Sequence, residues 1–340
     1  TNYRFGCNQL ERSDMAAFHL RQLFSQFSIS SRTSRISRIS CRSRRRTGGQ
    51  TALSLQNSIQ SLENRILPAT ITVTSLDDNL NADGFITLRE AIQAANTNKA
   101  VDGSVAGSVG EDTIVFAPTL DTSAGLVASL AMSGEQFTIS ESLKITGNGS
   151  LKTVIDASSS SRIFFVSSGS LTVEKLTLQN GNLSTDSGAG DLRNAGAAIL
   201  LASTGSLTIN DCRIQENTTA GAFSSGGAVA SVSGAITITG SLFRNNSTTG
   251  DSAPGGAVFS VSGAVQVSSS SFIQNSTTGA SSGGGAVAVA SAGLTVTDSL
   301  CNENFTQNTA SPGGAILTSS GSQAGPVPAN LYNSVQLLSQ

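Results

Sequence analysis

Tryptophan is absent from this sequence of 340 residues, and histidine occurs once, at His19. A single histidine near the N-terminus excludes a Ser-His-Asp triad or a histidine-based metal site from the rest of the chain. Aromatic residues account for 5% of the sequence and charged residues for 12%, whereas glycine occurs 35 times. This composition suits a repetitive β-protein better than a helical enzyme.

Cysteines are few, and long apolar runs are missing. Cys7, Cys41, Cys212 and Cys301 lack the close paired spacings of a zinc site or a disulfide framework. We expect Cys212 and Cys301 to be small buried residues, because a free cysteine packs like a small hydrophobic side chain. No run of 18 apolar residues occurs, so the sequence predicts no transmembrane helix.

Positive charge is concentrated in the N-terminal segment. Residues 1–68 contain 11 arginines, no lysine and three acids, a net charge of +8, whereas residues 69–340 carry −10. The Ser/Arg-rich stretch 28–50 is too polar to form a core, so we expect it to be disordered. The composition allows a nucleic-acid-binding tail or a mitochondrial transit peptide for this segment. The acidic body disfavours nucleic acid as a partner.

A regular repeat dominates the second half of the chain. Four Gly-Gly-Ala segments begin at Gly226, Gly255, Gly284 and Gly313, at a constant spacing of 29. A Phe-x-x-Asn marker accompanies three of them, as Phe243 with Asn246, Phe272 with Asn275, and Phe305 with Asn308. The spacing between the second and third markers widens to 33, which predicts an insertion in "DSLCNEN" that is compensated within the same unit.

Apolar residues alternate with Ser, Thr or Gly inside each unit, which predicts short strands joined by tight turns. One unit alone buries nothing, but stacked units place Phe243 over Phe272 and Val229 over Val258. The sequence therefore predicts an all-β fold, a parallel β-helix of roughly nine coils whose neighbouring strands lie about 4.8 Å apart. Weaker versions of the pattern occur at 137–147, 153–164, 164–181 and 194–217.

The recurring turn residues have structural interpretations. Asparagine tolerates left-handed backbone geometry and bonds local backbone, so the series Asn217, Asn246, Asn275 and Asn308 predicts a stacked ladder. The first three also fit the N-x-[ST] glycosylation pattern, which is the alternative. The paired glycines predict corners where no Cβ fits or where a positive φ is needed.

Acidic residues of the body are scattered. They do not recur at one position of the repeat, and they form no local cluster; examples are Asp156, Asp186, Asp191, Asp211, Asp251 and Asp298. Cleavage of a polysaccharide needs two or three converging carboxylates, or calcium with a basic residue. We therefore expect no enzyme, and name no catalytic, cofactor-binding or metal-binding residue. A polysaccharide-binding or polysaccharide-degrading β-helix (lyase or hydrolase) is the alternative.

The segment "NLNADGFITLREAI" (79–92) has two interpretations. Thr87 and Glu90 form a capping box, and an apolar stripe then predicts a short helix that covers the first coil. Alternatively, Asn79, Asn81, Asp83 and Glu90 occupy positions 1, 3, 5 and 12 of a calcium loop with Gly84 at position 6. Asn79 replaces the expected aspartate, and a strand-like "TITVT" precedes the loop, so we favour the cap and expect no cofactor.

Three stretches resemble known bacterial families. The GGA[ILV] and FxxN units at 194–316 resemble the repeats of polymorphic outer membrane proteins, which implies a right-handed parallel β-helix at a bacterial surface, often linked to adhesion. Residues 71–118 resemble the CSLREA motif through Leu88, Arg89, Glu90 and Ala91, although Ile86 and Thr87 replace its Cys and Ser. "SLENRILPA" (61–69) resembles the LEPR-XLL segment of exported proteins, with Asn64 in place of its Pro.

The expected organisation follows from these patterns. Residues 1–68 form a leader or export segment, and residues 69–340 form the β-helix. The β-helix comprises a CSLREA-like cap (69–118), irregular coils (119–193), regular repeats (194–316) and a ragged C-terminus (317–340). We expect a non-enzymatic structural or adhesive module, extracellular or at the outer membrane or cell surface of a bacterium, whose partner is an unidentified glycan or protein.

Overall fold

The structure, a computed structural model, describes residues 67–120, 128–186, 188, 191–307, 314–319 and 335–338. All of them belong to one compact unit, Leu62–Gln340. The described residues contain 28 strands, one α-helix and one 3-10 turn, η1 (Pro118–Leu120). The leader predicted at 1–68 lies almost wholly outside the described residues, as do Asn308 and Gly313.

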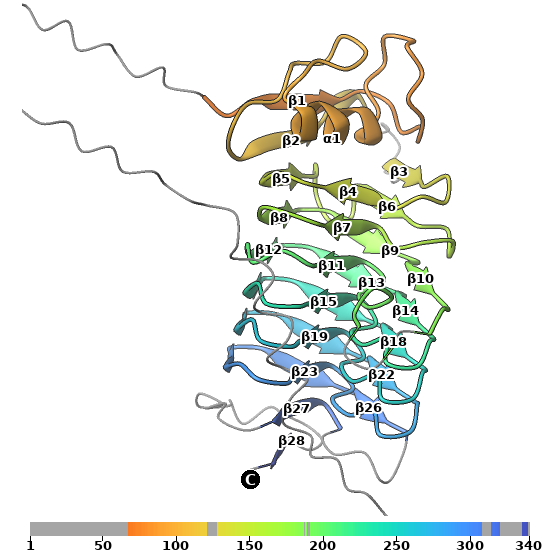
Figure 1. Ribbon diagram of the computed structural model, residues 1–340, viewed down its shortest axis with the longest axis vertical. Coiled ribbons are helices and arrows are strands. Elements are labelled where there is room, and N and C mark those ends of the chain that lie inside the picture. Colours follow the sequence, from red (N-terminus) through yellow and green to blue (C-terminus); the bar gives the residue numbers. More distant parts are fainter. Residues whose placement is uncertain are drawn as a thin grey trace, which may run out of the picture. The chain divides into compact units, whose positions relative to one another are not determined.

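The strands stack coil on coil into a parallel β-helix, as predicted (Figure 1). Sheet A has eight strands, in the order β1 (Thr70–Val73), β2 (Asp112–Phe116), β5 (Leu143–Thr146), β8 (Leu171–Glu174), β12 (Leu207–Asn210), β16 (Ile236–Thr239), β20 (Val265–Ser268) and β24 (Leu294–Thr297). Roughly nine coils were predicted. Among the described residues sheet A has eight strands, and its first coil is longer than the repeats, because Thr70 pairs with Thr113.

Sheet B forms a second side of the β-helix. Its strands are β3 (Ala128–Ala131), β6 (Thr153–Asp156), β9 (Thr177–Gln179), β13 (Arg213–Gln215), β17 (Leu242–Arg244), β21 (Ser271–Ile273) and β25 (Leu300–Asn302). Its central residues point inward, and Phe243 stacks on Phe272 with ring centroids 4.7 Å apart and planes 9° apart. The predicted phenylalanine column is confirmed.

Sheet C and the small sheet D complete each coil. Sheet C consists of β4 (Phe137–Ile139), β7 (Phe164–Val166), β11 (Ile199–Leu201), β15 (Val229–Ser231), β19 (Val258–Ser260), β23 (Val287–Val289), β27 (Ile316–Ser319) and β28 (Val335–Leu338). Sheet D consists of β10 (Asn182–Leu183), β14 (Thr218–Thr219), β18 (Ser247–Thr248), β22 (Ser276–Thr277) and β26 (Phe305–Thr306). Val229 pairs with Val258 in sheet C, as predicted.

The predicted insertion near the end of the repeats is wrong. Phe272 pairs with Cys301, one regular repeat later, and Asn275 hydrogen-bonds Asn304 at the same spacing. Phe305 instead pairs with Ser276 in sheet D, and 48% of its side chain is exposed. The sequence Phe305-x-x-Asn308 imitates the marker, whereas Cys301-x-x-Asn304 occupies its place, so the coil keeps the regular length without an insertion.

The asparagine ladder is confirmed for Asn217, Asn246 and Asn275, but its next member is Asn304 and not the predicted Asn308. Asn246 Oδ1 accepts from the backbone N–H and the side-chain amide of Asn217, and Asn275 Oδ1 accepts from Asn246 in the same way. The left-handed residue is the one before each ladder asparagine, for example Asn245 at φ 52° and Gln274 at φ 56°. Asparagine is thus needed for its amide and not for its backbone preference.

The paired glycines behave as predicted. Gly226, Gly255 and Gly284 have φ between 67° and 77°, where a side chain is strained. The second glycine of each pair has no room for a side chain. A Cβ on Gly256, for example, would lie 2.2 Å from the carbonyl oxygen of Gly285. Both reasons for glycine therefore apply, one at each position of the pair.

Helix α1 (Leu88–Thr97) covers the end of the stack at β1 (Figure 1). Thr87 and Glu90 form the predicted capping box, and the predicted stripe of Leu88, Ala91, Ile92 and Ala95 is buried in the common core. The helix also satisfies the edge strand β4. The Asn96 amide donates to Thr138 O at 2.8 Å and its Oδ1 accepts from Ser140 N at 2.9 Å, as a neighbouring strand would do.

Candidate functional site

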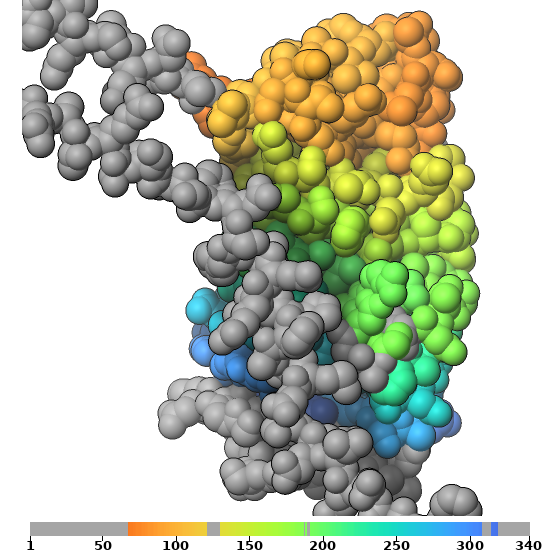
Figure 2. Space-filling view, in the orientation of Figure 1, coloured from red at the N-terminus to blue at the C-terminus, as the bar shows by residue number. Residues whose placement is uncertain are grey.

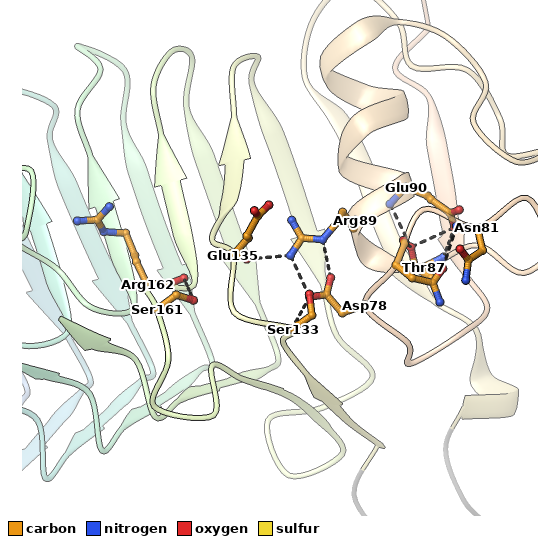
Figure 3. A network of polar contacts seen from close by, with 10 residues as sticks. Asp78, Asn81, Thr87, Arg89, Glu90, Ser133, Glu135, Ser161 and Arg162 are labelled. Carbon is orange, nitrogen blue, oxygen red and sulfur yellow. Dashed lines mark hydrogen bonds and ion pairs between the residues drawn. The ribbon is translucent and has the colours of Figure 1, made fainter.

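The predicted calcium ligands make local bonds at the cap. Glu90 Oε2 accepts from the backbone N–H and the hydroxyl of Thr87, at 2.9 and 3.0 Å (Figure 3). Asp83 Oδ1 accepts from Phe85 N, and Asn79 Oδ1 accepts from Asn81 N. Among the described residues no group of three or more His, Cys, Asp and Glu side chains is arranged to hold a metal ion. The segment is thus built as a helix cap in which Glu90 faces Thr87.

Arg89 ties the cap to the first irregular coil. Its guanidinium makes two bonds to Asp78, at 2.7 and 2.9 Å, and donates to Glu135 O at 2.8 Å (Figure 3). It also lies 4.6 Å from the centre of the Phe137 ring. Ser133 N–H and Oγ also donate to Asp78. Burial opposes ionisation of Asp78, but these hydrogen bonds outweigh it and hold the pKa of the carboxyl below its ordinary value. Asp78 and Arg89 thus hold the cap in place.

A second arginine is buried without a carboxylate partner among the described residues. Arg162 donates to the carbonyl oxygens of Ala195 and Gly196 and to Gln136 Oε1, and burial lowers its pKa to about 10. These acceptors belong to the loop before β11 and to the segment before β4. Arg162 therefore serves the folding of the long coil between β7 and β11.

A hollow of about 450 Å³ lies at the corner where sheet A turns into sheet B. Asp211 and Arg213 supply its charges, and Leu151, Leu242 and Ile273 supply its apolar surface. Asp211 lies beside Gly240, where a Cβ would approach its Oδ1 to 2.5 Å, so the glycine leaves room for the carboxylate. Asp211 is the only carboxylate that lines this hollow.

The prediction that acids do not recur at one position is wrong. Asp298 follows Asp211 by three full repeats, and both have a left-handed backbone in the same turn. Asp186 Oδ1 accepts from Ala222 N as Asp251 Oδ1 accepts from Ala280 N, so this pair shares a second position. Gly240 and Ser269 separate Asp211 from Asp298, however, so two coils lie between the two carboxylates.

The two thiols in the described part of the chain and the asparagines of the glycosylation patterns are buried. Burial raises the pKa of the Cys212 thiol to about 12 and that of Cys301 to about 11, so neither forms a nucleophilic thiolate at neutral pH. Cys301 continues the phenylalanine column, and Cys212 stands where the next three coils have Ser241, Ser270 and Ser299 in a second ladder. Asn217, Asn246 and Asn275 are fully buried, which makes glycosylation of the folded chain impossible at these residues.

The outer face of sheet A is the feature that sequence reasoning missed. Alternate residues of its eight strands point outward in two in-register columns, and ten of these sixteen residues are threonine. The first column runs Thr70, Thr113, Lys144, Thr172, Thr208, Thr237, Gln266, Thr295; the second runs Thr72, Val115, Thr146, Glu174, Asn210, Thr239, Ser268, Thr297. Thr208 and Thr237 are one regular repeat apart, but a longer coil separates Thr172 from Thr208 and Gln266 interrupts the series, so the sequence spacing carried only part of this signal.

We call the five residues Thr172, Thr208, Thr237, Gln266 and Thr295 the threonine column. Their strands follow one another directly in sheet A. None of their side chains hydrogen-bonds another described residue, whereas the second column contains a contact of 3.2 Å between Thr239 and Ser268. The threonine column therefore presents hydroxyl and amide groups to the outside along a straight line.

Charge on this face is neutralised. Lys144 and Glu174 are the only charged residues among the sixteen outward positions, and they form an ion pair of 2.9 Å with each other. Burial opposes ionisation of Glu174, but hydrogen bonds from Lys144 and Asn210 outweigh it and hold the pKa of its carboxyl below the ordinary value. The face thus offers hydrogen bonds without a net charge.

Comparison with known proteins adds no relative. A scan against models of protein families found no match, and searches of curated proteins and of solved structures also found none. None of the described helices has the length and hydrophobicity needed to span a bilayer.

Proposed function

We propose that this chain is a non-enzymatic adhesive module, secreted or held at the surface of a bacterium, which attaches to its partner through the outer face of sheet A. The observation that carries this proposal is the threonine column, whose polar side chains line up in register and have no partner within the described chain. Inward repeats such as the asparagine ladder are satisfied by one another. A ladder that is bonded within the fold, beside an outer column whose polar groups are left to solvent, suits a scaffold that displays a binding surface.

The bacterial surface location rests on the resemblance to polymorphic outer membrane proteins and exported proteins. Intact cells that make the protein should be treated with a protease that cannot enter them. Loss of the protein from intact cells supports surface display. Full protection, with digestion only after lysis, contradicts it.

Adhesion itself can be tested with beads that carry the full chain. We expect these beads to adhere to at least one of a panel of immobilised glycans, matrix proteins and whole cells, above beads that carry an unrelated folded protein. Beads carrying the triple variant Thr208→Val, Thr237→Val and Thr295→Val should adhere less. Equal adhesion of both kinds of bead to every surface contradicts the role of this face.

A polysaccharide-degrading enzyme is the second candidate, and the hollow beside Asp211 is the observation that favours it. Its volume of about 450 Å³ lies in the range of ligand pockets, which is about 300 to 1,000 Å³. Hydrolysis normally uses a pair of carboxylates, and Asp211 is alone in this lining. Release of reducing ends from a panel of polysaccharides, lost in Asp211→Asn, would favour the enzyme over the adhesive module.

A further inference from the structure

Strand propensity is the simplest explanation for the abundance of threonine on sheet A. Threonine is β-branched and favours strands at exposed positions, so strand propensity alone predicts some enrichment. Sheet B provides an internal control, because its strands are of similar length and belong to the same coils. Its twelve outward positions from β6 to β25 include one threonine, Thr177. Since ten of sixteen positions on sheet A are threonine, propensity does not account for the difference between the two faces.

The chemistry of the threonine column defines the kind of ligand. Each threonine offers a hydroxyl that both donates and accepts and a methyl group for apolar contact, and Gln266 adds an amide. With Lys144 and Glu174 paired, no net charge attracts an anion or a cation. A ligand that matches this face is neutral and rich in hydroxyl groups.

The geometry of the column defines the shape of the ligand. Adjacent strands of a sheet lie about 4.8 Å apart, so the five side chains form a line of contacts with that period. A small molecule would touch only one or two of them. A long chain with a repeating unit of similar length, running across the strands, would touch all of them.

Two repeating ligands fit such a period, a linear polysaccharide and the surface of an ice crystal. The face is uneven, because Gln266 and Asn210 are longer than the threonines around them. A flexible chain adapts to side chains of different length, whereas a crystal lattice does not. The unevenness therefore favours the polysaccharide.

We infer that the outer face of sheet A binds a linear neutral polysaccharide that lies along the coil axis, with successive sugars hydrogen-bonded to Thr172, Thr208, Thr237, Gln266 and Thr295. This inference rests on the proposed adhesive function and names its ligand class. Contact with several coils at once makes the binding multivalent, so weak single contacts add to a useful affinity.

The test is retention of the full chain on insoluble neutral polysaccharides, namely cellulose, β-1,3-glucan, mannan and chitin, with an acidic polysaccharide gel for comparison. We expect binding to at least one neutral polymer that is unchanged between low and high salt, since no ion pairs are involved. Each of Thr208→Val, Thr237→Val and Thr295→Val should weaken it about fivefold, the value of one hydrogen bond, and the triple variant about a hundredfold.

Valine keeps the branched shape and the strand propensity of threonine, so these variants replace only the hydroxyl with a methyl group. Thr249→Val is the matched control, because it makes the same substitution at an exposed threonine that follows β18, outside sheet A and outside the hollow beside Asp211, and it should bind like the wild type. Equal melting temperatures of all variants would exclude unfolding as the cause of lost binding.

Three results would overturn the inference. If the triple variant is retained as well as the wild type, the threonine column is not the binding site. If the protein is retained only on the acidic gel and salt releases it, the ligand is not a neutral polysaccharide. Incorporation into growing ice that the triple variant abolishes assigns the face to ordered water instead. If the beads described above adhere to a protein surface but no polysaccharide binds, this inference fails while the adhesive function stands. If they adhere to nothing, both fail.

Discussion

The asparagine ladder and the threonine column both run from coil to coil along the β-helix, but their side chains make different contacts. Asn246 lies inside the turn, fully buried, and its amide bonds Ile214 O and Asn275 Oδ1. Thr237 lies on the outer face and its hydroxyl bonds no described residue. The period of a repeat thus shows that residues stack, but only their contacts show whether the stack serves the fold or remains open to a partner.

The largest difference between inside and outside should come from phenylalanine. Phe272→Ala should destabilise the fold by about 4 kcal/mol, because it leaves a cavity beside the stacked ring of Phe243. Phe305→Ala, at a ring that is 48% exposed, should cost under about 1 kcal/mol. Urea unfolding of both variants measures these two changes in the free energy of unfolding. Similar losses at the two positions would mean that Phe305, and not Cys301, continues the column.

The second-largest loss of stability should come from a break in the asparagine ladder. Asn246→Ala should cost about 3 kcal/mol, because it leaves buried backbone and side-chain groups of the adjoining coils without partners. Urea unfolding followed by circular dichroism measures the loss. Asn302→Ala is the control, since Asn302 lies on the outside of sheet B in the same fold. A loss no larger than that of the control would show that the ladder is dispensable.

The cap should lose stability with acid. Asp78→Asn should cost about 2 kcal/mol at neutral pH by weakening the charged hydrogen bonds with Arg89. The folded-state pKa of Asp78 lies below its ordinary value of 3.8, so its contribution is present above that pH and disappears as the pH falls through the lower folded value. Melting curves of the two proteins should converge below about pH 4. A gap that persists unchanged at pH 2 would contradict this role.

The outer face should be nearly neutral for stability. Thr237→Val should change the free energy of unfolding by less than about 0.5 kcal/mol, because the hydroxyl has no partner to lose. Urea unfolding of Thr237→Val and Asn246→Ala gives the free energy of unfolding of each variant, so the threonine column and the asparagine ladder can be compared directly. A destabilisation as large as that of Asn246→Ala would mean that the threonine column serves the fold after all.

Calcium should have the smallest effect. Since Glu90 Oε2 is bonded by Thr87, we expect the melting temperature of the full chain to be the same with millimolar calcium and with chelator. Glu90→Gln should lower stability equally in both conditions. A rise of several degrees with calcium that disappears in Glu90→Gln would restore the loop of Asn79, Asn81 and Asp83 as a metal site.

Much of the fold was predictable because it depends on periodic burial. Spacing alone placed Phe243 over Phe272, and a local motif of Thr87 and Glu90 predicted the cap helix. The last coil was misread because Phe305 and Asn308 match the marker by residue type, whereas pairing depends on distance along the chain. Cys301 and Asn304 keep that distance with different chemistry at the first position.

The candidate site was harder to predict than the fold. Threonine on a strand is expected from propensity, so single threonines in the sequence did not indicate a site. The column becomes visible only from the strand pairing. For example, β8 pairs with β12 and aligns Thr172 with Thr208, although the coil between them is longer than the regular repeat. The hollow beside Asp211 is lined by residues from separate coils, including the exposed Leu151 from the loop before β6. Such contacts have no local signal, because they arise only when coils of unequal length are stacked.

Identical coil-to-coil bonding makes the length of the β-helix adjustable. In Figure 2 the colours pass from orange at the cap through green to blue along the stack, in the order of the sequence. Removal of residues 230–258 would join Val229 to Phe259 in the same register and leave Asn217 beside Asn275, which offers the same acceptor as Asn246. Recombination between neighbouring repeats in the gene can therefore delete or duplicate a whole coil without creating a mismatched junction. Such a change would lengthen or shorten the outer face in steps of one coil.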